Sequence, residues 1–206
     1  MAVTDLSYIG LQNAIIDWMV RPDLTTAQIK DAIWLFECEA TRRLRVRDNE
    51  TSVDLTTVAG VASVPDDFAS WRTMTWNGSP NIQLEYNHPN IVRAAYGTPV
   101  QDTPRWFTTE GDTFLFRPVD DGPSAFTLRY FQKISNLTDT MPTNWLLTKH
   151  ADLYLAGSLY NAYKFVRDPD AASAYNQIMQ DAFNQIIDLN ERFKEPAELR
   201  PMTVIV

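Results

Sequence analysis

Hydrophobic positions near the start of the chain repeat with the period of an amphipathic helix. Thr25 and Gln28 stand at the spacing of a capping box, which predicts where one helix begins. An apolar stripe then follows on one helical face, formed by Ile29, Ile33, Phe36, Ala40 and Leu44. An earlier helix is predicted with Asp5 as its cap, on the stripe Leu11, Ile15, Trp18 and Met19.

The helical period returns after Pro142. One helix is predicted from about residue 144 to residue 166, with a stripe of Leu153, Ala156, Leu159, Tyr160 and Tyr163. Asp168 then offers a cap and Pro169 fits the first helical position, which predicts the start of a long final helix. Its apolar stripe is Ala172, Tyr175, Ile178, Met179, Ala182, Ile186 and Leu189.

The middle of the chain alternates instead with the period of a strand. Asn77-Gly78 is a hairpin dipeptide, and Glu110-Gly111-Asp112 separates two further alternating runs. These patterns predict five or six antiparallel strands and a short helix over residues 88–96. We therefore expect an α+β fold in which residues 1–50 and 142–195 form a helical bundle and residues 51–141 form an inserted antiparallel β subdomain. Pro196 and Pro201 prevent a continuing helix, so residues 196–206 are predicted to be an extended arm.

The net charge of the chain limits which kinds of molecule it is expected to bind. The net charge is -8, with 26 acidic and 18 basic residues, and acids exceed bases in each third of the chain. A protein that grips DNA or an anionic membrane is disfavoured, because binding to phosphates needs clustered cations. A single cysteine, Cys38, forms no internal disulfide, and no signal peptide or membrane-spanning run is recognisable. The chain is expected to fold under cytosol-like conditions.

No motif in the sequence predicts catalysis, a cofactor or a metal site. His88 and His150 lack partners at metal-ligand spacing, and Cys38 lies between two glutamates, which do not favour a reactive thiolate. The acid pairs Asp66-Asp67 and Asp120-Asp121 fit turns better than a glycosidase site. A glycan-binding module remains open, because exposed tryptophans stack on sugars and the β region holds Trp71, Trp76 and Trp106.

One basic cluster interrupts the acidic composition: Arg42, Arg43, Arg45 and Arg47. Cations at the end of a helix offset its dipole, which is the simpler interpretation. The alternative is a subunit contact or a DNA-facing ring surface.

Several local patterns occur together in a characteristic order. Val64-Pro65-Asp66-Asp67-Phe68 precedes the Asn77-Gly78 hairpin, and Thr143-Asn144-Trp145-Leu146-Leu147 precedes Asp152-Leu153-Tyr154-Leu155-Ala156. Between them lie Phe114-Leu115-Phe116-Arg117-Pro118, Leu128-Arg129-Tyr130-Phe131 and Leu137-Thr138-Asp139. This order resembles the head-to-tail adaptor family of tailed phages, over about residues 25–195.

The resemblance implies a structural protein without catalytic residues, located in the virion at the neck. It implies a ring, usually of twelve copies, that docks beneath the portal protein and carries further tail, stopper or nozzle proteins. DNA would pass through this ring without specific binding. A glycan-binding or cell-wall-degrading component of the same tail is the alternative.

The end of the chain is the most specific prediction for docking. Residues 202–206 combine high β propensity with an apolar end, so they are expected to add as a strand to an open sheet edge or groove on the portal. They could instead lie on the protein's own β subdomain. The predicted portal or ring interface comprises Leu199, Met202, Val204, Ile205 and Val206, together with Arg42, Arg43, Arg45 and Arg47.

Overall fold

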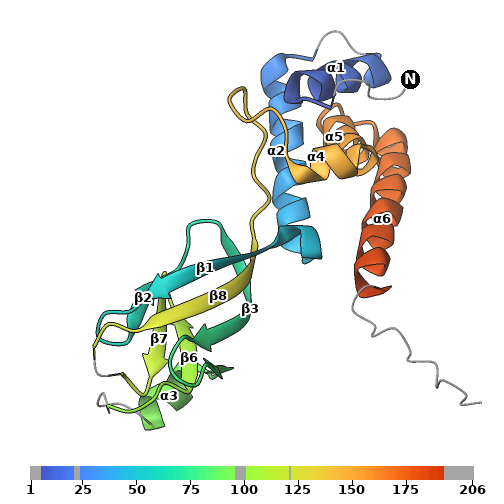
Figure 1. The fold of residues 1–206 in the computed structure, drawn as a ribbon. Coiled ribbons are helices and arrows are strands. Elements are labelled where there is room, and N and C mark those ends of the chain that lie inside the picture. Colours follow the sequence, from blue (N-terminus) through green and yellow to red (C-terminus); the bar gives the residue numbers. More distant parts are fainter. Residues whose placement is uncertain (1–5, 21–23, 96–100, 121, 193–206) are drawn as a thin grey trace, which may run out of the picture. The chain divides into compact units, whose positions relative to one another are not determined.

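The computed structural model describes residues 6–20, 24–95, 101–120 and 122–192. The chain divides into two compact units, which are described separately (Figure 1). A helical unit combines Met1–Arg47 with Ile134–Val206, and a β unit comprises Asp48–Lys133. Mixed helix and strand content agrees with the expected α+β class.

The helical unit contains α1 (Tyr8–Met19), α2 (Thr26–Arg43), α4 (Trp145–Lys149), α5 (Ala151–Phe165) and α6 (Pro169–Arg192). Helix α5 packs against both α2 and α6. The capping box of α2 is confirmed, because Thr25 Oγ1 accepts from Gln28 N and Thr25 N donates to Gln28 Oε1. Every predicted stripe residue of α2 is buried.

The first helix differs from the prediction at its start and on one face. Ser7 caps α1 by accepting a hydrogen bond from Gly10 N at 3.1 Å, while Asp5 lies outside the described residues. Trp18 is 44% exposed, since it precedes the buried Met19 by one residue and so points about 100° away around the helix. Tyr8 takes the inward position at the start of the stripe instead.

The predicted helix over residues 144–166 is two helices. His150 leaves helical geometry, with φ -137° and ψ 56°, and separates α4 from α5. Leu146, Leu147 and Leu153 are all fully buried on the two sides of this break. The apolar side chains on both sides of the break therefore contribute to the core of the helical unit.

Helix α6 begins as predicted, with Ala171 N donating to Asp168 Oδ1 at 3.1 Å. Its buried face is shifted from the predicted stripe. Ile178 and Leu189 are 52% and 50% exposed, and Phe183 is fully buried in the core.

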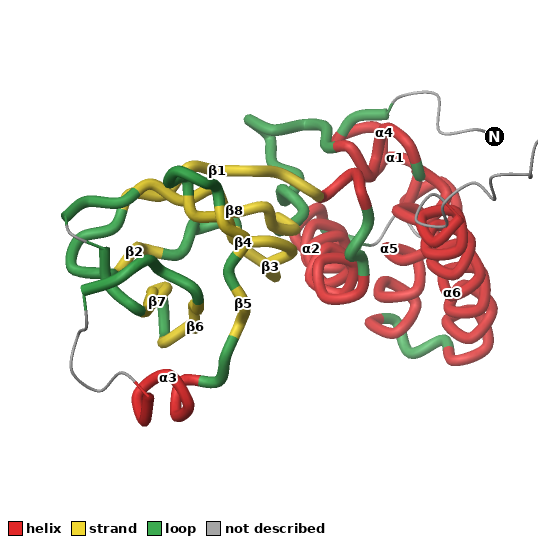
Figure 2. The backbone as a smooth tube through the Cα atoms, turned by 60° about the horizontal axis from the view of Figure 1, so that its bottom comes forward, coloured by secondary structure: helices red, strands yellow, loops and turns green. Residues whose placement is uncertain are grey.

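The β unit contains two four-stranded sheets (Figure 2). The first has the order β1 (Glu50–Thr56), β8 (Ala125–Gln132), β3 (Phe68–Trp76) and β4 (Ile82–Gln83). The second has the order β2 (Val61–Ser63), β7 (Thr113–Arg117), β6 (Trp106–Glu110) and β5 (Glu85–Tyr86). A short helix, α3 (Pro89–Ala95), follows β5, and a 3-10 turn, η1 (Arg47–Asn49), precedes β1.

The expectation of a purely antiparallel region was wrong at one pair of strands. β5 runs parallel to β6, whereas the other strand pairs are antiparallel. The segment from Ile82 to Tyr86, which follows the Asn77-Gly78 hairpin dipeptide, is divided, because β4 joins the first sheet and β5 the second. Leu84 lies between them and is buried, so this residue is where the chain crosses between the two sheets.

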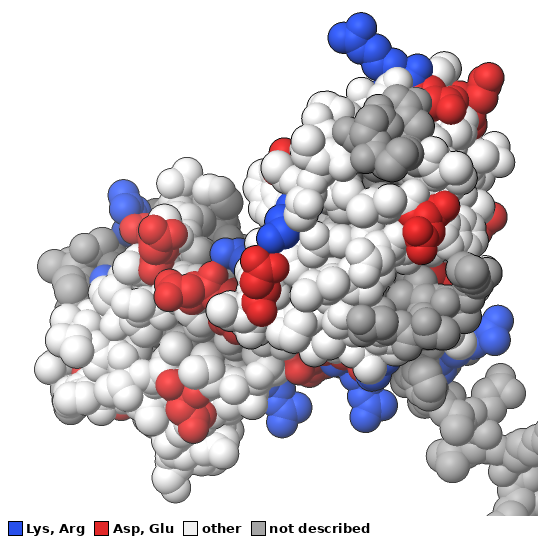
Figure 3. All heavy atoms as spheres, turned by 90° about the horizontal axis from the view of Figure 1, so that it is seen from above, with Lys and Arg blue, Asp and Glu red and all other residues white. Residues whose placement is uncertain are grey.

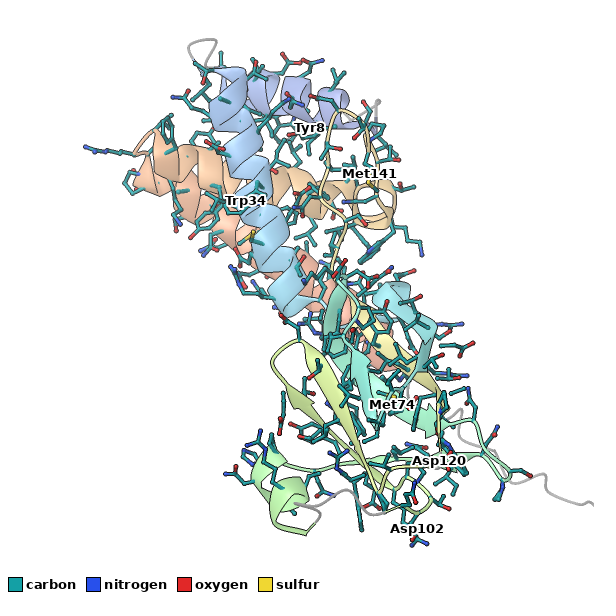
Figure 4. The ribbon with its side chains drawn as sticks, turned by 90° about the vertical axis from the view of Figure 1, so that its left-hand side faces the viewer. Tyr8, Trp34, Met74, Asp102, Asp120 and Met141 are labelled. Atoms are coloured by element: carbon teal, nitrogen blue, oxygen red, sulfur yellow. The ribbon has the colours of Figure 1, made fainter. Side chains whose placement is uncertain are left out.

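Aromatic side chains dominate the core of the β unit. Phe107, Phe114 and Phe116 are fully buried, and the rings of Phe116 and Phe126 stack with centroids 4.1 Å apart. Met74 on β3, labelled in Figure 4, is also fully buried in this cluster.

The boundary between the two units differs from the predicted one after the last strand. Ile134 and Leu137 belong to the helical core, so residues 134–141, which the sequence pattern grouped with the strands, lie in the helical unit. The expected arm over residues 196–206 lies outside the described residues.

Candidate interaction surfaces

Two of the four predicted arginines are held inside the helical unit. Arg43 pairs with Glu39 at 3.0 Å, donates to Gln180 Oε1 at 2.7 Å and lies over the Phe183 ring, 4.0 Å from its centroid. Arg45 donates to the carbonyls of Thr41 and Leu44 at the end of α2. The contacts of Arg45 match the simpler interpretation, in which cations satisfy the end of a helix, whereas those of Arg43 connect α2 to α6.

Arg42 and Arg47 present exposed side chains. No ion pair of either side chain occurs among the described residues, although the main chain of Arg47 donates to Asn190 Oδ1 at 3.0 Å. The cluster therefore offers two arginines to a partner and not four. On the face seen in Figure 3, acidic side chains are interspersed with basic ones and no broad basic surface forms.

The predicted tail contacts Leu199, Met202, Val204, Ile205 and Val206 all lie outside the described residues. The structure therefore neither joins them to the arginines nor separates them.

The tryptophans of the β unit do not form a flat platform for a sugar. Trp71 is 40% exposed, but its ring stacks on Tyr86 with centroids 5.4 Å apart. Trp76 is covered by Gly78, where an added Cβ would lie 2.1 Å from the indole ring. Trp106 is only partly exposed. Contacts within the subunit therefore occupy faces of Trp71 and Trp76 that a glycan would need.

A buried polar network in the helical unit was missed by the sequence reasoning. Glu37 is 1% exposed, and its Oε1 accepts from Leu137 N at 2.8 Å and from Tyr154 Oη at 2.5 Å. Asn144 extends the network, because its Nδ2 donates to Tyr154 Oη at 3.0 Å and to Ser135 O at 2.8 Å. Glu37 follows Ile33 by four residues, so its position on the apolar stripe was the signal that could have found it.

This network joins α2 and α5 to the segment that returns from the β unit. Burial raises the pKa of Glu37, although its hydrogen bonds from Tyr154 and Leu137 oppose that shift. Burial also raises the pKa of Tyr154, and the nearby Glu37 carboxylate adds to this increase. The arrangement is suited to fixing a loop, because each group has a defined partner.

The remaining titratable candidates have structural contacts. His88 Nδ1 accepts from Asn90 N at 3.3 Å near the start of α3, and the His150 ring meets Trp145 edge-on. Asp67 accepts from Tyr130 Oη at 2.8 Å, and burial together with this bond raises the pKa of Tyr130 to about 12. Asp120 accepts from Ser124 Oγ at 2.6 Å. Within the described ranges, no group of three or more His, Cys, Asp or Glu could hold a metal ion.

Exposed apolar side chains on α2 are a further surface that the periodicity did not identify. Trp34, which is labelled in Figure 4, and Leu35 are 52% and 48% exposed, and neither belongs to the buried stripe of α2. Exposed aromatic residues of this kind are common at protein interfaces. None of the helices in the described parts of the chain is long and apolar enough to cross a lipid bilayer.

Comparison with known proteins identifies the family. No curated protein sequence matches the chain. The family model of the SU10 adaptor protein, however, matches residues 6–202, which is nearly the whole chain. The match spans both units and agrees with the resemblance to phage adaptors and with a structural role in the virion. This protein belongs to the SU10 adaptor protein family.

Proposed function

We propose that this protein is a ring-forming subunit of the phage neck, docked beneath the portal, which extends the DNA channel and provides the platform for the tail. The observation that carries this proposal is the family match over residues 6–202. The ring is expected to contain twelve copies, with the portal on one side and further tail, stopper or nozzle proteins on the other.

The charge distribution supports a channel that does not retain DNA. The net charge is -8, and two of the four clustered arginines are engaged within the subunit. Each retained phosphate contact would slow the passage of DNA, so a lumen with few free cations suits the function. We expect no measurable binding to duplex DNA at physiological salt.

The proposed residues of the portal or ring interface are the tail, residues 196–206 as an extended arm, and the exposed Arg42 and Arg47. Arg43 and Arg45 contribute by shaping the end of α2. Docking on the portal would concentrate the subunits and add their mutual contacts, so the ring is expected to complete itself on the portal.

The test is to mix the purified protein with portal rings and to examine the mixture by electron microscopy. Stacked complexes with an added ring below the portal are expected. Absence of any complex across micromolar concentrations would refute the proposed function. Duplex DNA binding that depends on Arg42 and Arg47 would refute the proposed channel surface.

The rival function needs a separate measurement. Release of dye from labelled peptidoglycan measures cell-wall degradation, and we expect none above a boiled control. Release by the native protein would favour a wall-degrading component.

A further inference from the structure

β1 is an unusually open edge strand. Each sheet ends in two edge strands, and β4 and β5 have two residues each, β2 has three and β1 has seven. Edge strands are commonly blunted by bulges, prolines or lysines. β1 contains no proline or lysine, and its pairing with β8 runs from Glu50 to Thr56 without a register shift.

The direction of the main-chain groups follows from two neighbouring hydrogen bonds. Thr57 N donates to Ser124 O at 2.9 Å, toward β8, and Asn77 N donates to Ala125 O at 2.9 Å, from the β3 side of β8. Because hydrogen-bonding direction alternates along a strand, Ser52, Asp54 and Thr56 direct their N–H and C=O groups away from β8. No described residue hydrogen-bonds these main-chain groups.

The side chains of β1 leave this edge accessible. Glu50 forms an ion pair with Arg72 of β3, and Asp54 Oδ1 accepts from Thr127 Oγ1 of β8 at 2.7 Å. Both carboxylates therefore lean over the sheet and not past its edge. On the other face, Val53 and Leu55 pack against the aromatic core but stay only partly buried. A strand added beside β1 would cover their open side.

We propose that β1 accepts residues 202–206 of a neighbouring copy as an additional strand. This inference rests on the ring of the proposed function. Four of these five residues, Thr203, Val204, Ile205 and Val206, are β-branched, and Pro201 favours an extended approach. Residues 193–201 could span about 30 Å when extended, which gives the segment reach to a neighbour.

Pairing of β1 with the β1 strand of another copy would not build a ring. Two identical edges that pair with one another make a self-complementary contact, which closes a dimer. A tail that enters a different surface of the next copy makes a head-to-tail contact, which closes a ring. The tail therefore stabilises the ring itself, in place of the portal contact favoured by the sequence. Main-chain bonds supply affinity and alternate side chains supply register.

The experiment uses protein lacking residues 197–206 as the acceptor and a labelled synthetic peptide of residues 197–206 as the probe. Fluorescence anisotropy measures binding to the acceptor and to its variants Asp54→Pro and Asp54→Ala. Proline removes the outward N–H at an edge position where proline is tolerated. Alanine is the matched control, because it also loses the bond to Thr127 but keeps the main-chain N–H.

We expect the peptide to bind the acceptor and the Asp54→Ala variant within about twofold of each other. Asp54→Pro should weaken binding about tenfold or more, as expected for the loss of main-chain hydrogen bonds. Thermal melting shows whether each variant is folded, and Thr56→Pro serves as the second variant if Asp54→Pro does not fold.

Three outcomes would overturn the inference. The first is equal binding to the proline and alanine variants, and the second is no binding to the acceptor. The third is a full-length monomer that excludes the peptide, because its own tail would then occupy β1. Binding of the peptide by portal rings but not by the acceptor would assign the tail to the portal. Stacking of the full-length protein on portal rings is scored separately, so the adaptor function is judged independently of this edge.

Discussion

The helical unit and the β unit bury their side chains in different ways. Among the described residues, the core of the helical unit is mainly aliphatic and includes Tyr8, Phe36, Tyr154 and Phe183 as its buried aromatic side chains. The smaller core of the β unit contains Phe107, Phe114, Phe116, Phe126 and Tyr130 among only nine buried residues. A few large aromatic rings therefore form most of the buried core of the β unit, whereas many aliphatic side chains form that of the helical unit.

The two units also differ in whether the main-chain N–H and C=O groups at the ends of helices and at sheet edges have hydrogen-bond partners. Side-chain caps occur at α1, α2, α4 and α6, and Arg45 satisfies carbonyls at the end of α2. The β unit instead leaves the outward groups of β1 without a partner in the described chain. Within the described residues, side chains thus satisfy the ends of the helices in the helical unit, while the β unit presents an open edge at β1.

Loss of one ring from the aromatic core is expected to have the largest effect. Phe116→Ala removes a fully buried side chain that stacks on Phe126, and should destabilise the β unit by about 3–5 kcal/mol. Hydrogen exchange followed by mass spectrometry should show lost protection in β7 and β8 while α2 and α5 keep theirs. Phe165→Ala is the control, since Phe165 is 58% exposed and should change stability little. Equal loss of protection in both units would show that the two cores unfold together.

The close contact of α2 with α5 gives the next largest effect. Alanine is normally favoured over glycine in a helix by about 1 kcal/mol. At Gly157, however, an added Cβ would lie 1.9 Å from the Phe36 ring. Gly157→Ala should therefore destabilise the helical unit by about 2–4 kcal/mol, measured by urea unfolding. The double variant Gly157→Ala/Phe36→Leu should recover part of this loss. A stabilised single variant would show that the helices separate easily.

The buried polar network gives a smaller effect that depends on pH. Glu37→Ala leaves the Leu137 N–H and the Tyr154 hydroxyl without their acceptor, and should cost about 2–3 kcal/mol. Glu37→Gln keeps an acceptor oxygen and removes the ionisation.

Burial raises the pKa of Glu37 in the folded protein, so the folded state holds its proton to higher pH than the unfolded chain does. The contribution of Glu37 is therefore most favourable below its unfolded pKa and is lost as pH rises through the folded pKa. The stability of Glu37→Gln relative to the native protein should increase over that interval, as measured by urea unfolding at a series of pH values. A constant difference would indicate that Glu37 does not change ionisation on folding.

The sequence predicted the helical unit best where a regular stripe and local capping agreed. The stripe of α2 and its capping box both follow from spacing, and both are confirmed. Spacing failed where long-range packing decided the outcome. The sequence predicted one helix over residues 144–166, and no local signal marks the break at His150.

The β unit shows the other limit of prediction. The hairpin dipeptide Asn77-Gly78 was recognisable, but the division of the following segment between two sheets and the parallel pairing of β5 with β6 depend on partners distant in sequence. The arginine cluster was visible as a group, yet the engagement of Arg43 with Gln180 and Phe183 required the fold. The role of Glu37 was not predicted, because its hydrogen-bond partners Leu137 and Tyr154 are distant in sequence.

The smallest predicted effect tests whether caps close the helical unit. Thr25 lies on the surface, yet its side chain accepts from Gln28 N at 3.3 Å and its main-chain N–H donates to Gln28 Oε1 at 2.9 Å. Thr25→Ala should lower the free energy of unfolding by about 1 kcal/mol, because an N–H in the first turn of α2 loses its acceptor. Thr26→Ala is the matched control, since it removes the same hydroxyl from the next, exposed position and should change stability by less than about 0.5 kcal/mol. Hydrogen exchange at the start of α2 gives the local measurement. If both variants exchange alike, packing of α2 against α5 alone holds that end of the helix, and the contrast between a capped helical unit and an open β edge loses this part of its support.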